Sequence, residues 1–137
     1  MMRQLFTAPR IFTATAGEQE TLVDSAVLVD TEGRIEAIGK TLDLRQKGLS
    51  ETQLDGVLLP GLLDVHTHLC LSASMDPFGD ALAEHPARMT LRAVAALSAH
   101  IDAGVTTIRD VGGLHGIDLE MQHLVDDDSV EGPAVFA

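Results

Sequence analysis

The sequence has no tryptophan and no tyrosine, and only four phenylalanines stand among its 137 residues. Because 45% of the residues are nonetheless hydrophobic, the core is expected to consist of Leu, Val, Ile and Ala. A single cysteine, Cys70, excludes an internal disulfide. The sequence also lacks the apolar run of about 20 residues that spans a bilayer and the apolar segment of a secretion signal. These absences argue against a disulfide-stabilised secreted protein and against a helical membrane protein.

Basic residues are scarce as well: nine Lys and Arg oppose 21 Asp and Glu, which gives a net charge of −12. A surface of this sign repels nucleic acid and anionic membranes, so neither is expected as a partner. The same charge predicts a soluble cytoplasmic protein. By length the chain corresponds to one ordinary domain.

The most informative stretch is LPGLLDVHTHL, at residues 59–69. Its Pro-Gly pair predicts a turn that leads into a short apolar strand ending in two histidines. Because successive side chains on a strand point to opposite faces, Asp64, His66 and His68 are expected on one face. Neutral imidazole is the commonest protein ligand for metals, so the pair predicts a metal site. The alternative is that both rings simply line a half-exposed strand.

A second strand is predicted at residues 105–110, within GVTTIRDVGG (residues 104–113). Apolar residues recur with helical spacing over residues 89–103, and Gly104 ends that helix as a glycine cap. Strand, helix and strand in this order predict a βαβ unit with two parallel strands. A further amphipathic helix is expected at residues 116–128 and the start of a third strand at residues 132–137.

The residues before this unit predict further strands. Residues 5–15 are rich in apolar and β-branched residues and predict one or two short strands interrupted at Pro9. Two further runs, at residues 24–30 and 34–39, flank Thr31-Glu32-Gly33 and predict a hairpin. Loops, each with a helical turn, are expected at residues 41–50 and 71–86.

Both motifs resemble one family. LPGLLDVHTHL resembles the PGLxDxHxH signature on the first barrel strand of the metal-dependent amidohydrolase superfamily. GVTTIRDVGG is similar to the second barrel strand of the branch that includes Xaa-Pro dipeptidases and imidazolonepropionase-like enzymes. The resemblance implies an α/β fold, the amino-terminal part of a (β/α)8 TIM barrel preceded by strands of a small β-sandwich. We expect the sandwich strands in residues 1–59 and the first βαβα units of the barrel in residues 60–137.

The length of the chain limits what this resemblance implies. A complete (β/α)8 barrel typically needs ~250 residues, and the family adds the sandwich beside it. The chain is therefore expected to be an amino-terminal fragment, in agreement with its end inside the third predicted strand. In that strand Ala134 stands where the family commonly has Arg.

By this resemblance His66 and His68 are ligands of a divalent metal, with zinc the expected ion and one or two ions in the complete site. The family completes that site with a bridging carboxylated Lys or a Glu, two more His and an Asp. These residues come from later strands that the chain does not contain, so no catalytic residue is assigned here.

Four further residues are candidates for contacts around the site. Asp64 is expected either to accept a hydrogen bond from an imidazole N–H or to bond a neighbouring loop. Arg109 and Asp110, at the end of the second strand, either touch substrate or pair with neighbouring groups inside the barrel. His115 follows the paired glycines on a loop that would face the site, where it either contacts a ligand or remains solvated.

The implied function is hydrolysis of a C–N bond in a small amide, cyclic amide or dipeptide-like substrate by metal-activated water. An Xaa-Pro dipeptidase is the narrower expectation. The alternative is a catalytically inactive truncated or split chain that acts only through association with a partner chain. An incomplete barrel exposes strand edges and an apolar face, so an oligomer or a partner chain is expected in either case.

Overall fold

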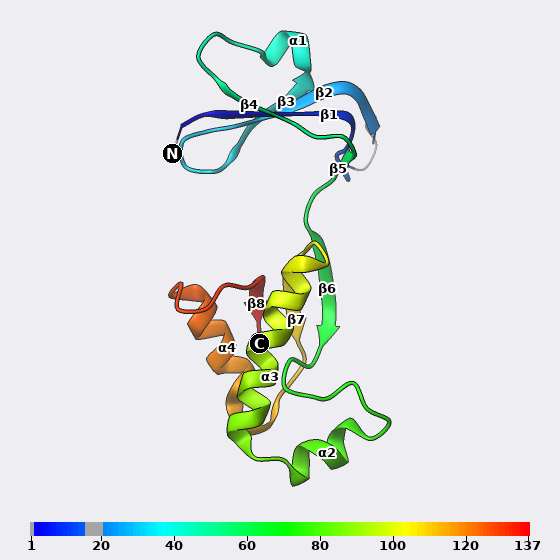
Figure 1. Ribbon diagram of the computed structural model, residues 1–137, viewed down its shortest axis with the longest axis vertical. Helices are drawn as coiled ribbons and strands as arrows, with labels where there is room; N and C mark the ends of the chain where they lie inside the picture. The colour runs from blue at the N-terminus through cyan, green and yellow to red at the C-terminus, as the bar shows by residue number, and fades with distance from the viewer. Residues whose placement is uncertain (1, 16–20) are drawn as a thin grey trace. The chain divides into compact units, whose positions relative to one another are not determined.

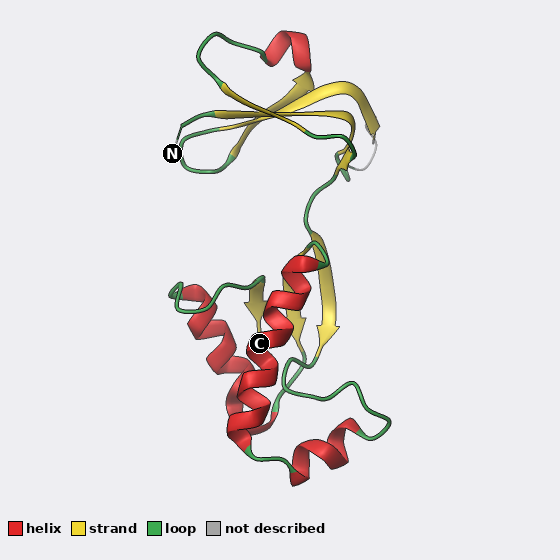
Figure 2. Ribbon diagram, viewed as in Figure 1, coloured by secondary structure: helices red, strands yellow, loops and turns green. Residues whose placement is uncertain are grey.

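The computed structural model describes residues 2–15 and 21–137. Contacts between residues divide the chain into two compact units, Met1–Pro60 and Gly61–Ala137, and Figures 1 and 2 show the elements of each. The first unit consists mainly of strands, and the second alternates strands with helices. The chain is therefore α/β as a whole, with the strand-rich part first.

The amino-terminal unit is a five-stranded sheet in the order β3-β2-β1-β4, with β5 also paired to β1. β1, β2 and β3 are antiparallel neighbours, whereas β4 and β5 run parallel to β1. Its elements are β1 (Gln4–Phe12), β2 (Thr21–Val29), β3 (Ile35–Lys40), α1 (Thr41–Leu44), β4 (Ser50–Gln53) and β5 (Val57–Leu58). The described strands of this unit thus make one sheet.

The predicted hairpin between β2 and β3 is confirmed. The Asp30 carboxylate accepts hydrogen bonds from the backbone N–H groups of Arg34 (2.9 Å) and Glu32 (2.8 Å). These bonds, the one from Arg34 above all, hold the pKa of Asp30 below its usual value. Gly33 has the positive φ of +83° that a glycine adopts without strain. The turn therefore depends on one side-chain acceptor and one glycine.

β1 runs through Pro9, so the expected interruption there is wrong. Against β2 the register skips from Ala8 to Arg10, and Pro9 lies opposite Asp24, whose φ is +49°. On the other side, the pairing with β4 ends before Pro9 and the pairing with β5 begins after it. Proline has no N–H to donate. It is therefore tolerated within a continuous strand at a position that pairs with neither neighbouring strand.

The carboxy-terminal unit is a three-stranded parallel sheet, in the order β6-β7-β8. Its elements are β6 (Leu62–Thr67), α2 (Pro77–Ala83), α3 (Pro86–Asp102), β7 (Val105–Asp110), the 3-10 turn η1 (Leu114–Gly116), α4 (Ile117–Asp126) and β8 (Ala134–Phe136). The predicted βαβ unit and the start of a third strand are confirmed. Among the described residues, no helix combines the length and the apolar character needed to cross a bilayer.

α3 begins earlier than the apolar pattern predicted. α3 begins at Pro86, because proline suits the first helical position, where its missing N–H needs no partner. The Nδ1 atom of His85 caps this helix by accepting the N–H of Ala87 (3.2 Å). α2 begins in the same way at Pro77, with Asp76 as its cap. The expected loop between β6 and α3 therefore contains a helix of seven residues, longer than the single turn predicted.

Side chains from α3, α4 and the sheet form the core of the carboxy-terminal unit. They include Met89, Ala93 and Leu97 of α3, Ile117 and Met121 of α4, Ile108 of β7 and Val135 of β8. Each large apolar side chain buried in this way contributes roughly 1.5–3 kcal/mol to stability. The expected aliphatic core is confirmed, but two methionines belong to it, and none of the four phenylalanines is buried.

The two faces of the parallel sheet differ. α3 and α4 pack over one face (Figure 2). On the other face Leu63 and Val65 of β6 are 67% and 73% exposed, and Phe136 of β8 is 57% exposed. Because parallel sheets usually have both faces covered, this bare apolar face is exceptional for an isolated unit. We call it the open face.

Gly61 allows β6 to approach β7 closely. A Cβ at this position would lie 1.9 Å from Thr106 Oγ1 and 2.7 Å from Thr106 Cβ. The backbone N–H of Leu62 donates to the carbonyl oxygen of Gly104 (2.9 Å) at the same place. The first contact between the two strands therefore requires a residue without a side chain.

We expect Gly61→Ala to lower the free energy of unfolding by about 1–3 kcal/mol, because the new methyl group overlaps Thr106. Urea denaturation followed by far-UV circular dichroism measures the change. Gly56→Ala is the control, since a Cβ there meets no atom within 4 Å, and its effect should be close to zero. Equal stabilities of the Gly61→Ala variant and the wild type would contradict the close approach.

Candidate metal centre

Between Asp64 and Thr67, β6 carries an extra residue relative to its neighbour β7. Asp64 pairs with Ile108 and Thr67 pairs with Asp110, so β6 advances by three residues where β7 advances by two. An extra residue of this kind is a β-bulge, and it reverses the alternation of side chains beyond it. Ile108 is buried under the helices, and Asp110 lies two residues further on the same side. Their partners Asp64 and Thr67 therefore share the helix-covered side.

The bulge separates Asp64 from the two histidines. His66 precedes Thr67 in the strand and therefore faces the open side, and His68 follows directly after the carboxyl end of β6. The prediction that Asp64, His66 and His68 share one face is wrong, because the strand is irregular between them. The Asp64 carboxylate instead accepts the backbone N–H of His66 (3.0 Å) and lies 3.8 Å from Nε2 of His100 in α3.

His68 is held in one orientation by the loop that follows β7. Its Nδ1 atom lies 2.7 Å from the carbonyl oxygen of Gly112. Since a carbonyl oxygen only accepts, Nδ1 is the donor, and Nε2 is left for another partner. Histidines that bind metals typically donate their second ring N–H in this way. Phe78 of α2 packs edge-on against the same ring, with 6.1 Å between the ring centroids.

The two imidazoles are close enough to share one ion. Their centroids are 5.6 Å apart, and their planes meet at 78°. With metal–nitrogen bonds of about 2.0–2.1 Å, two imidazoles on one tetrahedral ion have centroids roughly 5 Å apart. His66 is exposed, and its ring makes no hydrogen bond to any described residue. The separation of the two rings is therefore compatible with two donors to one divalent metal.

The described residues do not complete a metal site. Within residues 2–15 and 21–137, no three His, Cys, Asp or Glu side chains are grouped so that they could hold a metal ion. Zinc sites in proteins use at least three protein ligands. The described part of the chain therefore provides two nitrogen donors, and a functional ion needs further donors.

Arg109 and Asp110 point to opposite sides of β7 and do not pair with each other. Asp110 is only 2% exposed, and its carboxylate accepts the backbone N–H groups of Leu69 and Gly112, both at 3.0 Å. Arg109 lies on the open face. It lines a hollow of about 230 Å³, whose other lining residues are Leu63, Asp64, Val65, Thr107, Ile108 and Phe136. Asp110 thus bonds neighbouring backbone, while Arg109 faces the side of the sheet that carries the histidines.

The loop after β7 passes close to the end of β6 because of two glycines. Gly112 has a φ of +126°, which favours glycine. A Cβ on Gly113 would lie 3.2 Å from both Cys70 Sγ and Asp118 Oδ1. His115 follows in η1 with a φ of +63°, and the structure does not group it with the histidine pair. The glycines therefore place the carbonyl oxygen of Gly112 against His68, and His115 has no part in this contact.

Asp80 orders the segment that joins β6 to α3. The hydroxyls of Ser74 and Ser72 hold the pKa of Asp80 below its ordinary value of 3.8, and Ser72 Oγ donates to the carboxylate at 2.8 Å. Arg92 of α3 donates to the carbonyl oxygen of Cys70 (3.0 Å). These bonds fix the segment that carries α2 beside the histidines.

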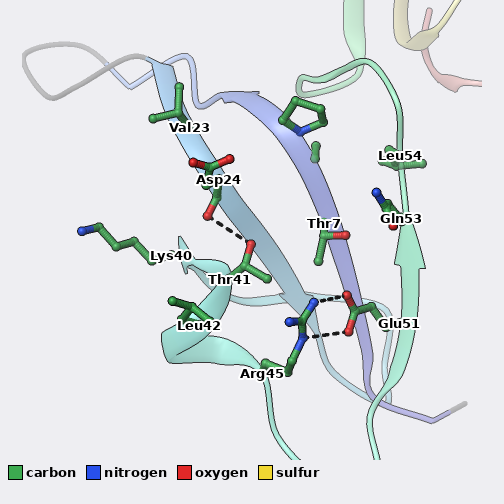
Figure 3. A pocket seen from close by; sticks show the side chains of 12 residues that line it. Thr7, Val23, Asp24, Lys40, Thr41, Leu42, Arg45, Glu51, Gln53 and Leu54 are labelled. Carbon is green, nitrogen blue, oxygen red and sulfur yellow. Dashed lines mark hydrogen bonds and ion pairs between the residues drawn. The ribbon is translucent and has the colours of Figure 1, made fainter.

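A larger hollow, of about 640 Å³, lies in the amino-terminal unit between α1 and strands of its sheet (Figure 3). Arg45 and Glu51 face each other there through two hydrogen bonds, which raise the pKa of Arg45 and lower that of Glu51. No histidine or cysteine stands among the described residues that line it. The hollow is therefore not a candidate for metal chemistry, although it is the larger of the two.

The sequence points to the two histidines but not to the groups that hold His68. The ring of His68 contacts Phe78 and the carbonyl oxygen of Gly112. Asp110 accepts the backbone N–H of Leu69, the residue that follows His68. The paired glycines of GVTTIRDVGG are the one sequence signal of a close approach at this loop. Nothing in the sequence pattern indicates which residue that loop approaches.

No family model matches the chain, but it is similar to known proteins in sequence and in fold. Over 66 residues, which cover 44% of this chain and 16% of the relative, the sequence is 44% identical to an imidazolonepropionase of Aromatoleum aromaticum. The fold is similar to that of a Xaa-Pro dipeptidase with bound methionine, with a TM-score of 0.77 at 19% identity over 98% of this chain and 32% of that one. It is also similar to that of an amidohydrolase, with a TM-score of 0.71 at 24% identity over 97% of this chain and 31% of that one.

These likenesses differ in what they cover. At such identities the two structures show the fold alone, and the α/β arrangement of this chain matches the amino-terminal region of amidohydrolase folds. The chain spans 16% of the length of the curated relative and about a third of the length of each structure. These likenesses therefore show the fold of this chain and not the activity of a whole protein.

Acid is expected to weaken the segment around α2. Because the folded pKa of Asp80 is lowered from 3.8, the carboxylate stabilises the fold above that pH, and its contribution is lost as the pH falls through the folded pKa. Asp80→Asn should therefore melt at a lower temperature than the wild type at pH 6, and the difference should shrink below about pH 3.8. Asp55→Asn is the control. A difference in melting temperature between Asp80→Asn and the wild type that stays the same at every pH would exclude this role.

Proposed function

The resemblance of this chain to the amino-terminal portion of the amidohydrolase superfamily is confirmed, and on that premise we propose that it contributes two metal ligands to a hydrolase of C–N bonds. His66 and His68 are the proposed ligands of a divalent metal, with zinc the expected ion. The substrate is a small amide or a dipeptide-like molecule. A complete site holds one or two ions.

The observation that carries this proposal is the geometry of the histidine pair. The rings are 5.6 Å apart, and His68 donates Nδ1–H to the carbonyl oxygen of Gly112. Both lie at the carboxyl end of a parallel strand, the end at which barrel enzymes build their active sites. A divalent metal bound there would lower the pKa of a water molecule toward neutrality and polarise a carbonyl group.

We further propose that residues 1–59 contribute strands to a small β-sandwich and that residues 60–137 form the first βαβα units of a (β/α)8 barrel. The parallel order β6-β7-β8 supports the second assignment. So does the open face, because a barrel buries the side of its sheet that faces away from the helices. In that arrangement Leu63, Val65 and Phe136 would lie in the barrel interior.

The other candidate residues receive different roles. Arg109 faces the open side and is proposed to reach the substrate, where its guanidinium suits a carboxylate. Asp64 and Asp110 bind backbone N–H groups and are not proposed to touch substrate. His115 stays a candidate for a loop contact with substrate. An Xaa-Pro dipeptide is the narrower proposal for the substrate.

A second candidate function is association without catalysis. The open face and the outer edges of β6 and β8 expose apolar side chains and backbone groups that favour pairing with another chain. The coding sequence downstream separates the two readings. A continuing frame with a strand-borne Lys or Glu, two His and an Asp would support the hydrolase, whereas unrelated sequence would support association alone.

We expect each histidine of the pair to contribute to metal binding. His66→Ala and His68→Ala should each weaken Co²⁺ or Zn²⁺ binding at least about tenfold, since each removes one of two donors. Equilibrium dialysis with metal analysis measures this at neutral pH. His123→Ala is the matched control, because His123 is an exposed histidine of α4 and its loss should change nothing. Unchanged affinity in both site variants would exclude the pair as ligands.

The 137-residue chain alone is expected to show no turnover of an Xaa-Pro dipeptide above the buffer rate with Zn²⁺ present. The physical reason is that two donors hold zinc weakly and leave the ion exchangeable. Product formation followed by chromatography, with metal content determined on the same sample, tests this. Turnover at an ordinary enzymatic rate with about one ion per chain would contradict it.

A further inference from the structure

A closed ring of hydrogen bonds links Asp110 to both the backbone and the side chain of His68. Asp110 Oδ2 accepts the N–H of Leu69, the residue that follows His68, at 3.0 Å. Asp110 Oδ1 accepts the N–H of Gly112 at 3.0 Å. The carbonyl oxygen of Gly112 then accepts Nδ1–H of His68 at 2.7 Å. The ring therefore begins at the peptide after His68 and ends on its imidazole.

The surroundings make this ring of hydrogen bonds rigid. Asp110 and Leu69 are each only 2% exposed, and hydrogen bonds to a carboxylate are stronger in such a dry setting. The N–H of Val111 donates to the carbonyl oxygen of Thr67 (3.0 Å), which ties the same loop to the end of β6. The positive φ of Gly112 and the close approach of Gly113 to Cys70 leave the loop little freedom.

Each bond in the ring has a defined direction. Both backbone N–H groups can only donate, so both oxygens of Asp110 must accept. The Gly112 carbonyl can only accept, so it selects the His68 tautomer with the proton on Nδ1. The unprotonated Nε2 of that tautomer is the atom able to bind a metal.

We propose that Asp110 is a positioning residue for His68: it fixes the loop whose carbonyl oxygen sets the orientation and the tautomer of the ring. Asp110 touches neither substrate nor metal and acts through Gly112 and Leu69. The inference rests on the proposed function only in naming a metal as the partner of Nε2. The tautomer itself is a property of the metal-free chain.

The first test is the tautomer of His68 in the wild-type chain, read from ¹⁵N NMR of the imidazole nitrogens at pH 8, where an ordinary imidazole is neutral. We expect the Nδ1–H form to predominate. Predominance of the Nε2–H form, which an unrestrained imidazole prefers, would overturn the proposal without any variant.

The second test replaces the carboxylate. Asp110→Ala removes both acceptors and should shift His68 toward the Nε2–H form, and Asp110→Asn, which keeps one acceptor oxygen, should give an intermediate shift. Asp64→Asn is the matched control, because Asp64 also accepts a backbone N–H beside a histidine but has no link to Gly112. It should leave the His68 tautomer unchanged. An unchanged tautomer in folded Asp110→Asn or Asp110→Ala would overturn the proposal.

Metal affinity separates this proposal from the proposed function. If His68 is a ligand, Asp110→Ala should weaken Co²⁺ binding by about 10–100-fold, the usual loss when a group that orients a ligand is removed. A tautomer shift in Asp110→Ala, combined with a Co²⁺ affinity that neither His66→Ala nor His68→Ala reduces, would refute the metal ligands and leave the positioning role intact. Full affinity in Asp110→Ala, combined with a loss in His68→Ala, would refute the positioning role alone.

Discussion

The pairing of β6 with β7 is the interaction on which the rest of the carboxy-terminal unit depends. Gly61 lets the strands meet at one end, where any side chain would overlap Thr106. At the other end the N–H of Val111 reaches the carbonyl oxygen of Thr67, and Asp110 reaches Leu69. Between these ends the register shifts twice, and the second shift is the bulge between Asp64 and Thr67. The bulge decides which side of the sheet each polar residue of β6 occupies, and so it decides the composition of the site.

The sheet that results has two unlike faces. Buried side chains of α3 and α4 cover one, and Leu63, Val65 and Phe136 stay exposed on the other. The histidines stand at the carboxyl edge of the exposed face, beside the bare apolar surface. Under the proposed function, whatever covers that surface also supplies the further metal donors. The same feature therefore underlies both the proposed hydrolase and the alternative of association with another chain.

Local chemistry made much of the fold predictable. The apolar period of α3, the cap at Gly104 and the β-rich run of β7 involve neighbours within a few residues, and all three are confirmed. The hairpin after β2 follows from Asp30 and Gly33 in the same local way. The apolar pattern predicts too late a start for α3, because a capping side chain and a proline, His85 and Pro86, precede that pattern. The predicted interruption at Pro9 is wrong because the gap in strand pairing at Pro9 depends on the register of β1 with the strands on both sides.

By itself the sequence determined which donors are present, their spacing in Asp64-Val65-His66-Thr67-His68 and the strand–helix–strand order around them. Tertiary structure alone decided that Asp64 turns away from the histidines and that Asp110, 41 residues from Leu69, holds the backbone beside His68. The physical reason is that alternation along a strand is a local rule, whereas a bulge arises from pairing with a distant strand. Similarly, the tautomer of His68 follows from the Gly112 carbonyl, 44 residues away. The motif gives the spacing of the two histidines, and the neighbouring strand and its loop orient His68.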